Sequence, residues 1–206
     1  MNTSSAKHVT VILPRERVTD FSSLLQHGIL YAVDKPVHIS SFLLALPGFS
    51  AEYLAKNVQT VFINGSAADS LDRFLGPGGT LALSAAMPGL AGAIFRRQGL
   101  HSTLRSRTED TVHSGNSEPG FITLKLFNSI ASERVPQLMA QGILIDSKAF
   151  LDFAGRREKL FQPPVQLVFA GKPLPYAEMF ETLQQTPLVK IEVRYLPDAS
   201  GAGEVV

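Results

Sequence analysis

Alternating apolar positions mark two segments near the C-terminal end of the chain. The alternation runs over residues 165–169 and returns over residues 189–195. This period of two predicts two strands, each with one face in a core. Between them, residues 170–173 predict a tight turn, because Gly171 can adopt positive φ. Residues 176–183 can supply a short helical or irregular crossing.

The same order of elements occurs earlier in the chain. Residues 58–63 predict a strand that closes at Asn64 and Gly65, and an Asn-Gly pair after such a run is a strong hairpin signal. Residues 76–79 (Gly-Pro-Gly-Gly) predict a turn, and residues 80–83 predict the strand that closes this unit. We expect residues 58–63 to pair with residues 80–83.

Three matches between the two halves follow one another in the same order. Such ordered matches favour an internal duplication, whereas the alternative is two unrelated half-buried sheets whose Val/Ile patterns agree by chance. The matching segments are residues 9–13 with 122–126, residues 25–30 with 139–144, and residues 58–59 with 165–166.

Each half also contains an apolar segment that predicts a helix lying across its sheet, over residues 40–46 and 147–159. Shorter helices are expected with caps at Thr19 and Ser132, because hydroxyl side chains favour that position. The predicted core side chains are Val11, Leu44, Phe62, Leu81, Leu124, Phe150, Val168 and Ile191.

The strand, the Phe-Ala-Gly-Lys turn at residues 169–172 and a last strand that contains Arg194 resemble the second half of ubiquitin. The resemblance implies a β-grasp fold. It also places Val168 and Glu192 at positions of ubiquitin's recognition face, where Glu192 introduces a charge. The predicted fold class is therefore α+β, with two tandem β-grasp-like modules, each a mixed sheet crossed by a helix.

The first half also resembles the small sulfur carriers of the molybdopterin and thiamin pathways. The resemblance rests on the turns at residues 62–65 and 76–79 and on Pro-Gly-Leu-Ala-Gly at residues 88–92. Those proteins act through a C-terminal Gly-Gly, and here residues 200–206 read Ser-Gly-Ala-Gly-Glu-Val-Val. Sulfur-carrier chemistry is therefore the least favoured of the functions considered.

The predicted organisation has four parts. Residues 8–86 form the first module, residues 87–119 a connector and linker, residues 120–197 the second module, and residues 198–206 a flexible tail.

The amino-acid composition argues against several classes of function. A formal net charge of +1 gives no electrostatic basis for nucleic-acid binding. The absence of cysteine excludes thiol catalysis and disulfides, and the five histidines lack metal-ligand spacing. We expect no metal and no cofactor, and no Ser, His and acid fall in a familiar nucleophile pattern. The protein is therefore expected not to be an enzyme.

Residues 74–95 contain no charged side chain and reach the length of a membrane span. Glycine and proline within them, together with the strand predicted at residues 80–83, argue against a span. The N-terminal residues contain no apolar segment typical of a signal peptide, so a cytoplasmic location is expected.

The connector combines an uncharged stretch with a group of arginines. One interpretation is that it covers a module and leaves the arginines in solvent. The other is that an aromatic side chain and the arginines bind an acidic partner, because guanidinium groups pair with carboxylates in bidentate fashion. The candidate residues are Phe95, Arg96, Arg97, Arg105 and Arg107.

A protein-binding accessory or scaffold protein is the predicted function, since the β-grasp fold is commonly used for docking and no catalytic arrangement is visible. The alternative is a small-ligand or nucleotide-binding protein with a pocket between the two halves.

Overall fold

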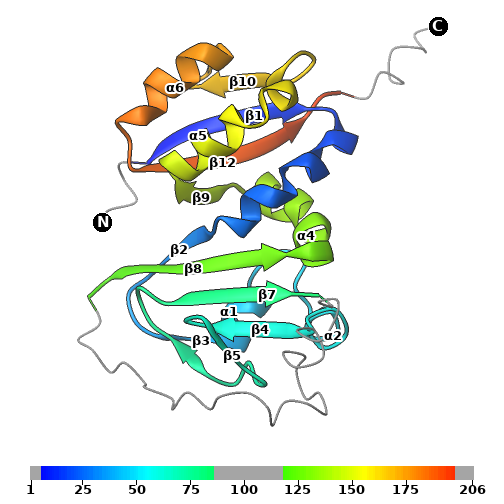
Figure 1. Ribbon diagram of the computed structural model, residues 1–206, viewed down its shortest axis with the longest axis vertical. Helices are drawn as coiled ribbons and strands as arrows, with labels where there is room; N and C mark the ends of the chain where they lie inside the picture. The colour runs from blue at the N-terminus through cyan, green and yellow to red at the C-terminus, as the bar shows by residue number, and fades with distance from the viewer. Residues whose placement is uncertain (1–5, 86–117, 198–206) are drawn as a thin grey trace, which may run out of the picture.

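The computed structural model describes residues 6–85 and 118–197, and its fold class is α+β (Figure 1). The first half contains β1 (Lys7–Leu13), the 3-10 helix η2 (Arg15–Gln26), β2 (Ile29–Val33), β3 (Val37–His38), α1 (Ile39–Leu44), α2 (Ala51–Lys56), β4 (Thr60–Ile63), β5 (Ser66–Ala67), β6 (Phe74–Leu75) and β7 (Thr80–Ser84). The second half contains β8 (Gly120–Phe127), α4 (Asn128–Gln141), β9 (Ile143–Asp146), α5 (Ser147–Gly155), the 3-10 helix η4 (Glu158–Phe161), β10 (Gln166–Phe169), β11 (Lys172–Pro173), α6 (Tyr176–Gln184) and β12 (Leu188–Tyr195).

These strands form two five-stranded mixed sheets and a two-stranded ribbon. Sheet A has the order β11-β10-β1-β12-β9, sheet B has the order β2-β8-β7-β4-β5, and the ribbon pairs β3 with β6. In each five-stranded sheet a central parallel pair lies between antiparallel neighbours. Sheet A with α5 and α6 lies at one end of the molecule, sheet B with α1 and α2 at the other, and η2 and α4 lie between them (Figure 1).

The strand pairing does not follow the two halves of the sequence. Residues 8–86 and 120–197 are predicted to form one module each, yet β1 from the first half lies inside sheet A and β8 from the second half lies inside sheet B. Alternation shows that a strand is half buried but does not identify its neighbour. The predicted boundaries therefore need correction, because each sheet depends on both halves of the chain.

The hairpin predicted at Asn64-Gly65 and the tight turn predicted at residues 170–173 are both confirmed. Asn64 and Gly65 both have positive φ, 51° and 82°, and join β4 to β5. Ala170 and Gly171 do the same between β10 and β11, with φ of 50° and 75°. Positive φ at both central residues matches the right-handed twist of the flanking strands. The pairing of β4 with β7 is confirmed as well.

The helix boundaries differ in part from the sequence expectations. The Asp146 side chain accepts a hydrogen bond from the Ala149 N–H and begins α5. Gly142, with φ of 85°, ends α4. Thr19 and Ser132 do not cap, because η2 begins at Arg15 and α4 begins at Asn128. An earlier start adds a helical turn whose buried Ile130 packs into the core.

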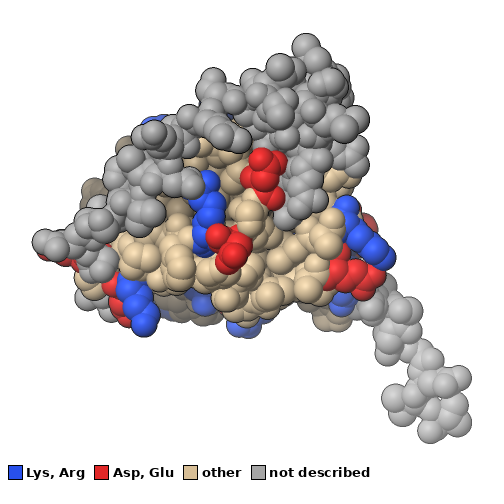
Figure 2. Space-filling model, turned by 90° about the horizontal axis from the view of Figure 1, so that it is seen from below, with Lys and Arg blue, Asp and Glu red and all other residues tan. Residues whose placement is uncertain are grey.

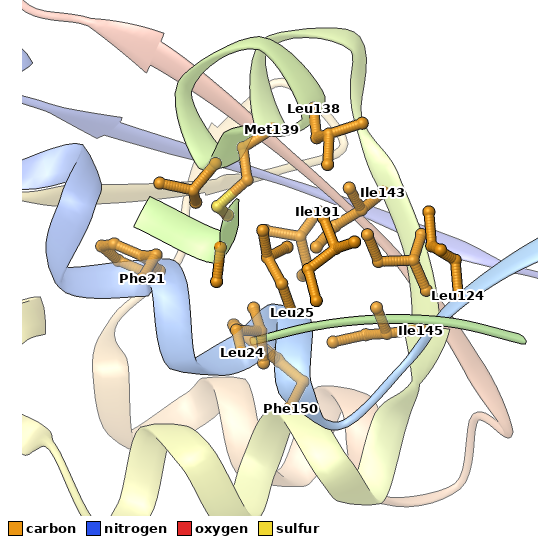
Figure 3. Packing of buried hydrophobic residues seen from close by; sticks show 14 of the residues in the cluster. Phe21, Leu24, Leu25, Leu124, Leu138, Met139, Ile143, Ile145, Phe150 and Ile191 are labelled. Atoms are coloured by element: carbon orange, nitrogen blue, oxygen red, sulfur yellow. The ribbon is translucent and has the colours of Figure 1, made fainter. Parts of the chain in front are cut away.

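One hydrophobic cluster runs through the described part of the molecule and joins the two sheets. Side chains of η2, α4 and the strands beside them fill the space between the halves (Figure 3). Labelled members include Phe21, Leu24, Leu25, Leu124, Leu138, Met139, Ile143, Ile145, Phe150 and Ile191.

Three of the predicted core positions need correction. Leu44 is 48% exposed, because it ends the short helix α1 on the side turned away from the buried Leu43. Phe62 and Val168 are only partly buried. Each is on the outer side of its strand, whereas its neighbours Val61 and Leu167 point into the core.

Candidate functional sites

The connector residues proposed from sequence as a partner-binding site lie outside the described residues. Phe95, Arg96, Arg97, Arg105 and Arg107 all fall between residues 85 and 118. Their role in binding an acidic partner stays a prediction.

A chain of three polar side chains lies on the ribbon at the sheet B end of the molecule. His38 Nε2 is 2.6 Å from Asp72 Oδ1, and His38 Nδ1 is 2.9 Å from Ser40 Oγ. Because a carboxylate only accepts hydrogen bonds, the pairing with Asp72 assigns the ring proton of neutral His38 to Nε2. Nδ1 is then the acceptor for the Ser40 O–H. The three groups thus form one directed path from hydroxyl to imidazole to carboxylate.

Backbone pairing brings these three residues together. His38 pairs with Phe74 in the ribbon, and the Ile39 N–H donates to the Arg73 carbonyl at 2.9 Å. Asp72 directly precedes Arg73, and its own N–H donates to Ser70 Oγ at 2.9 Å. Ser40 follows in the first turn of α1. The sequence gives no sign of this arrangement, because a short strand pairing joins positions that no local motif connects.

Phe74 is the most exposed large apolar side chain of the described residues. It is 67% exposed, and Leu44 at the end of α1 is 48% exposed. The Phe74 ring meets the His38 ring edge-on, with centroids 5.2 Å apart and planes at 81°. Viewed from this end, the described surface is largely uncharged, with basic and acidic side chains in small groups (Figure 2). Folding therefore leaves an ordered aromatic ring in solvent.

The outer face of sheet A carries Val168 and Glu192, the two positions for which the sequence predicted a recognition face. Thr10 of β1 lies in register with Val168 on one side and Glu192 on the other. Glu192 Oε2 lies 3.0 Å from His8 Nε2, and its Oε1 accepts from Arg194 Nε at 2.8 Å. The hydrogen bond from Arg194 lowers the pKa of Glu192. A paired carboxylate therefore occupies the middle of this face, and its neighbours already satisfy it.

A third polar group joins the two halves of the chain. The Tyr53 hydroxyl of α2 donates to Glu133 Oε2 of α4 at 2.6 Å, and the Arg134 guanidinium lies 3.8 Å from the centroid of the Tyr53 ring. Arg134 also donates to the Gly48 carbonyl. Burial of the ring, followed by the hydrogen bond to Glu133, raises the pKa of Tyr53 to about 12. We interpret this group as a structural clasp, since its hydrogen bonds and its ring contact join α2, α4 and the backbone at Gly48.

Residues 6–85 and 118–197 contain neither a metal-binding cluster nor a membrane-spanning helix. No group of three or more His, Asp or Glu side chains in these ranges could hold a metal ion. Among the helices in the same ranges, none has the length and apolar character that crossing a membrane requires.

The chain was compared with known proteins. No protein-family model, curated protein or solved structure matches it.

Proposed function

We propose that this protein is a protein-binding scaffold or accessory subunit built from two β-grasp-like modules. Two observations support the β-grasp part of the proposal. Each five-stranded sheet is mixed, with a parallel pair at its centre, and helices lie against both sheets. The hairpins at Asn64-Gly65 and Ala170-Gly171 occupy the same place in the two halves.

The exposed Phe74 ring is the observation that carries the binding function. The exposed part of an aromatic side chain adds nothing to folding, whereas burying it in a partner removes a large apolar area from water. Aromatic residues are enriched among the side chains that dominate binding energy at interfaces. Phe74 is therefore the proposed anchor, with Leu44 as a second apolar contact.

The local structure also favours binding by reducing its entropic cost. Backbone pairing with His38 fixes β6, and the edge-on contact with the His38 ring limits the orientation of Phe74. A side chain that is ordered before binding loses less conformational entropy on association. This pre-organisation distinguishes Phe74 from an exposed residue on an irregular loop.

The alternative function, a ligand pocket between the halves, has less support. The space between η2 and α4 is occupied by packed apolar side chains, among them Leu24, Leu25 and Met139, which are all at most 1% exposed (Figure 3). A small-molecule pocket needs a concave site with a few convergent polar groups, and these side chains supply none.

Chemical cross-linking in cells of the source organism tests the proposal. Epitope-tagged wild type is compared with Phe74→Ser, and Val168→Ser on the outer face of sheet A is the matched control. We expect a defined cross-linked protein that Phe74→Ser loses and Val168→Ser retains, with all three chains melting at similar temperatures. If only Val168→Ser loses the cross-linked protein, the interface lies on sheet A instead. Identical cross-links in all three would refute docking through Phe74.

A further inference from the structure

We propose that Ser40 is a nucleophile for acyl transfer, with His38 as its general base and Asp72 as the residue that positions His38. The substrate class is small, unhindered esters with an apolar or aromatic group. This activity goes beyond the proposed scaffold function, and the two can be tested separately, because Ser40→Ala removes the nucleophile but leaves Phe74 and Leu44 in place.

The hydrogen-bond path supplies the activation that a serine hydroxyl requires. A serine becomes nucleophilic when an adjacent base accepts its proton and a third group orients that base. Here Ser40 Oγ lies 2.9 Å from His38 Nδ1, and His38 Nε2 lies 2.6 Å from Asp72 Oδ1. Both distances fall within hydrogen-bond reach. The two ring nitrogens have exchanged the roles that they have in Ser-His-Asp hydrolases, which are recognised by roles rather than by sequence position.

The surroundings of the three side chains keep this path in place and give access to it. The Ile39 side chain is buried and anchors the start of α1 between His38 and Ser40. The Ser70 hydroxyl accepts from the Asp72 N–H and fixes the approach of the carboxylate. Ser40 and His38 are both partly exposed, so a small substrate can reach them.

The exposed Phe74 ring determines the substrate class. Its centroid lies 5.2 Å from that of the His38 ring, so an apolar or aromatic group of the ester can rest on it beside the reacting atoms. An exposed ring beside His38 offers a small apolar contact area, which favours small substrates.

The proposed reaction is ester hydrolysis, with water as the second substrate. Ser40 Oγ forms a bond to the ester carbonyl carbon while its proton moves to His38 Nδ1. The bond from that carbon to the leaving oxygen then breaks, and the leaving oxygen takes the proton from His38. Water attacks the acyl-Ser40 ester with the same proton transfers, which releases the carboxylic acid and restores the Ser40 hydroxyl.

A fluorophosphonate probe tests the nucleophile directly on the full chain, with peptide mapping to locate the label. Ser41 provides a matched control because it is the adjacent serine and is exposed. We expect wild type and Ser41→Ala to be labelled at Ser40 and Ser40→Ala to remain unlabelled there. Equal labelling of Ser40→Ala, label on Ser41, or an unlabelled wild type would overturn the proposal.

Substitutions at the other two positions test their roles. His38→Gln should slow labelling at least about 100-fold, the lower end of the usual contribution of a general base. Asp72→Asn should slow labelling and Asp72→Glu should restore it in part, with melting temperatures unchanged. Wild-type rates in a folded His38→Gln would overturn the assignment. If that variant does not fold, the same rate in Asp72→Asn and wild type would overturn it.

Discussion

Sheets A and B have the same pattern of strand directions but are assembled differently from the chain. In sheet A the first strand of the chain, β1, lies at the centre between β10 and β12. In sheet B the corresponding strand of the second half is β8. It is not the central strand but the one next to the edge strand β2, with β7 on its other side. The sequence patterns of β1 and β8 match, yet their neighbours differ.

This comparison shows how the two halves depend on each other. Each half supplies the other's sheet with a strand from its own beginning, and the following helix carries the chain back across the molecule. The two crossing helices, η2 and α4, pack against each other, as do β2 and β9 where the sheets meet. The two sheets therefore share one folding unit, although the duplication in sequence predicts two.

Separating the halves should have the largest effect. A chain of residues 1–85 lacks β8, and a chain of residues 118–206 lacks β1, so each would expose the edge and the apolar face of an incomplete sheet. We expect neither fragment to give a cooperative thermal transition in circular dichroism, and a co-expressed mixture to regain one. A fragment that melts cooperatively by itself would contradict the strand exchange.

Replacing a phenylalanine with alanine should cost more stability in the shared core than on the outer face of sheet B. Phe150 is fully buried, so Phe150→Ala should lower the free energy of unfolding by about 3–5 kcal/mol. Phe62 is only partly buried on the outer side of β4, so Phe62→Ala should cost roughly 1 kcal/mol. Chemical denaturation measures both values, and equal costs would be inconsistent with this packing.

The clasp between α2 and α4 should contribute less to the free energy of unfolding than Phe150 does. Tyr53→Phe removes the 2.6 Å hydrogen bond to Glu133 and should cost about 1–2 kcal/mol, because the carboxylate loses its donor. Ultraviolet titration provides a second measurement. The pKa of Tyr53, about 12 in wild type, should fall in Glu133→Gln but stay above its ordinary value, because burial is the larger cause. If the free energy of unfolding and the pKa of Tyr53 both stay at their wild-type values, the clasp is excluded.

The smallest expected effect lies on the outer face of sheet A. The pKa of Glu192 is lowered, first by the hydrogen bond from Arg194. A carboxylate with a lowered pKa adds stability above its ordinary pKa, and this stability is lost as the pH falls through the folded-state value. Glu192→Gln should therefore slightly reduce the loss of stability on acidification at low salt. An acid limb identical to that of wild type would show that this pairing adds no stability.

The sequence predicted those features of the fold that depend on local chemistry. Asn64 and Gly65 predicted a hairpin because both had to adopt positive φ, and the alternation within β10 and β12 identified the strands. Strand partners could not be predicted in this way, since the outward side chains of β1 and β8 do not specify which sheet each strand enters. Leu44 was misassigned because it ends a helix too short to show which side faces the core.

The site formed by His38, Ser40 and Asp72 could not be predicted from the sequence for a similar reason. His38 and Ser40 are close in the chain, but Asp72 reaches them only through the pairing of β3 with β6. Each of those strands has two residues, which is too short to produce a recognisable pattern. Exposure of Phe74 likewise follows from tertiary structure, because its residue type predicts burial.

Engineered disulfides test the strand exchange most directly, since the protein contains no cysteine of its own. Thr10 and Val168 face each other across β1 and β10, and opposed residues of antiparallel strands lie within the range of a disulfide. If each half formed its own sheet, Thr10 would instead take the place of its match Thr123 and lie beside Thr80 of β7. We expect mild oxidation to cross-link Thr10→Cys/Val168→Cys within the monomer and to leave Thr10→Cys/Thr80→Cys open. Closure of the second pair without the first would contradict the exchange of strands.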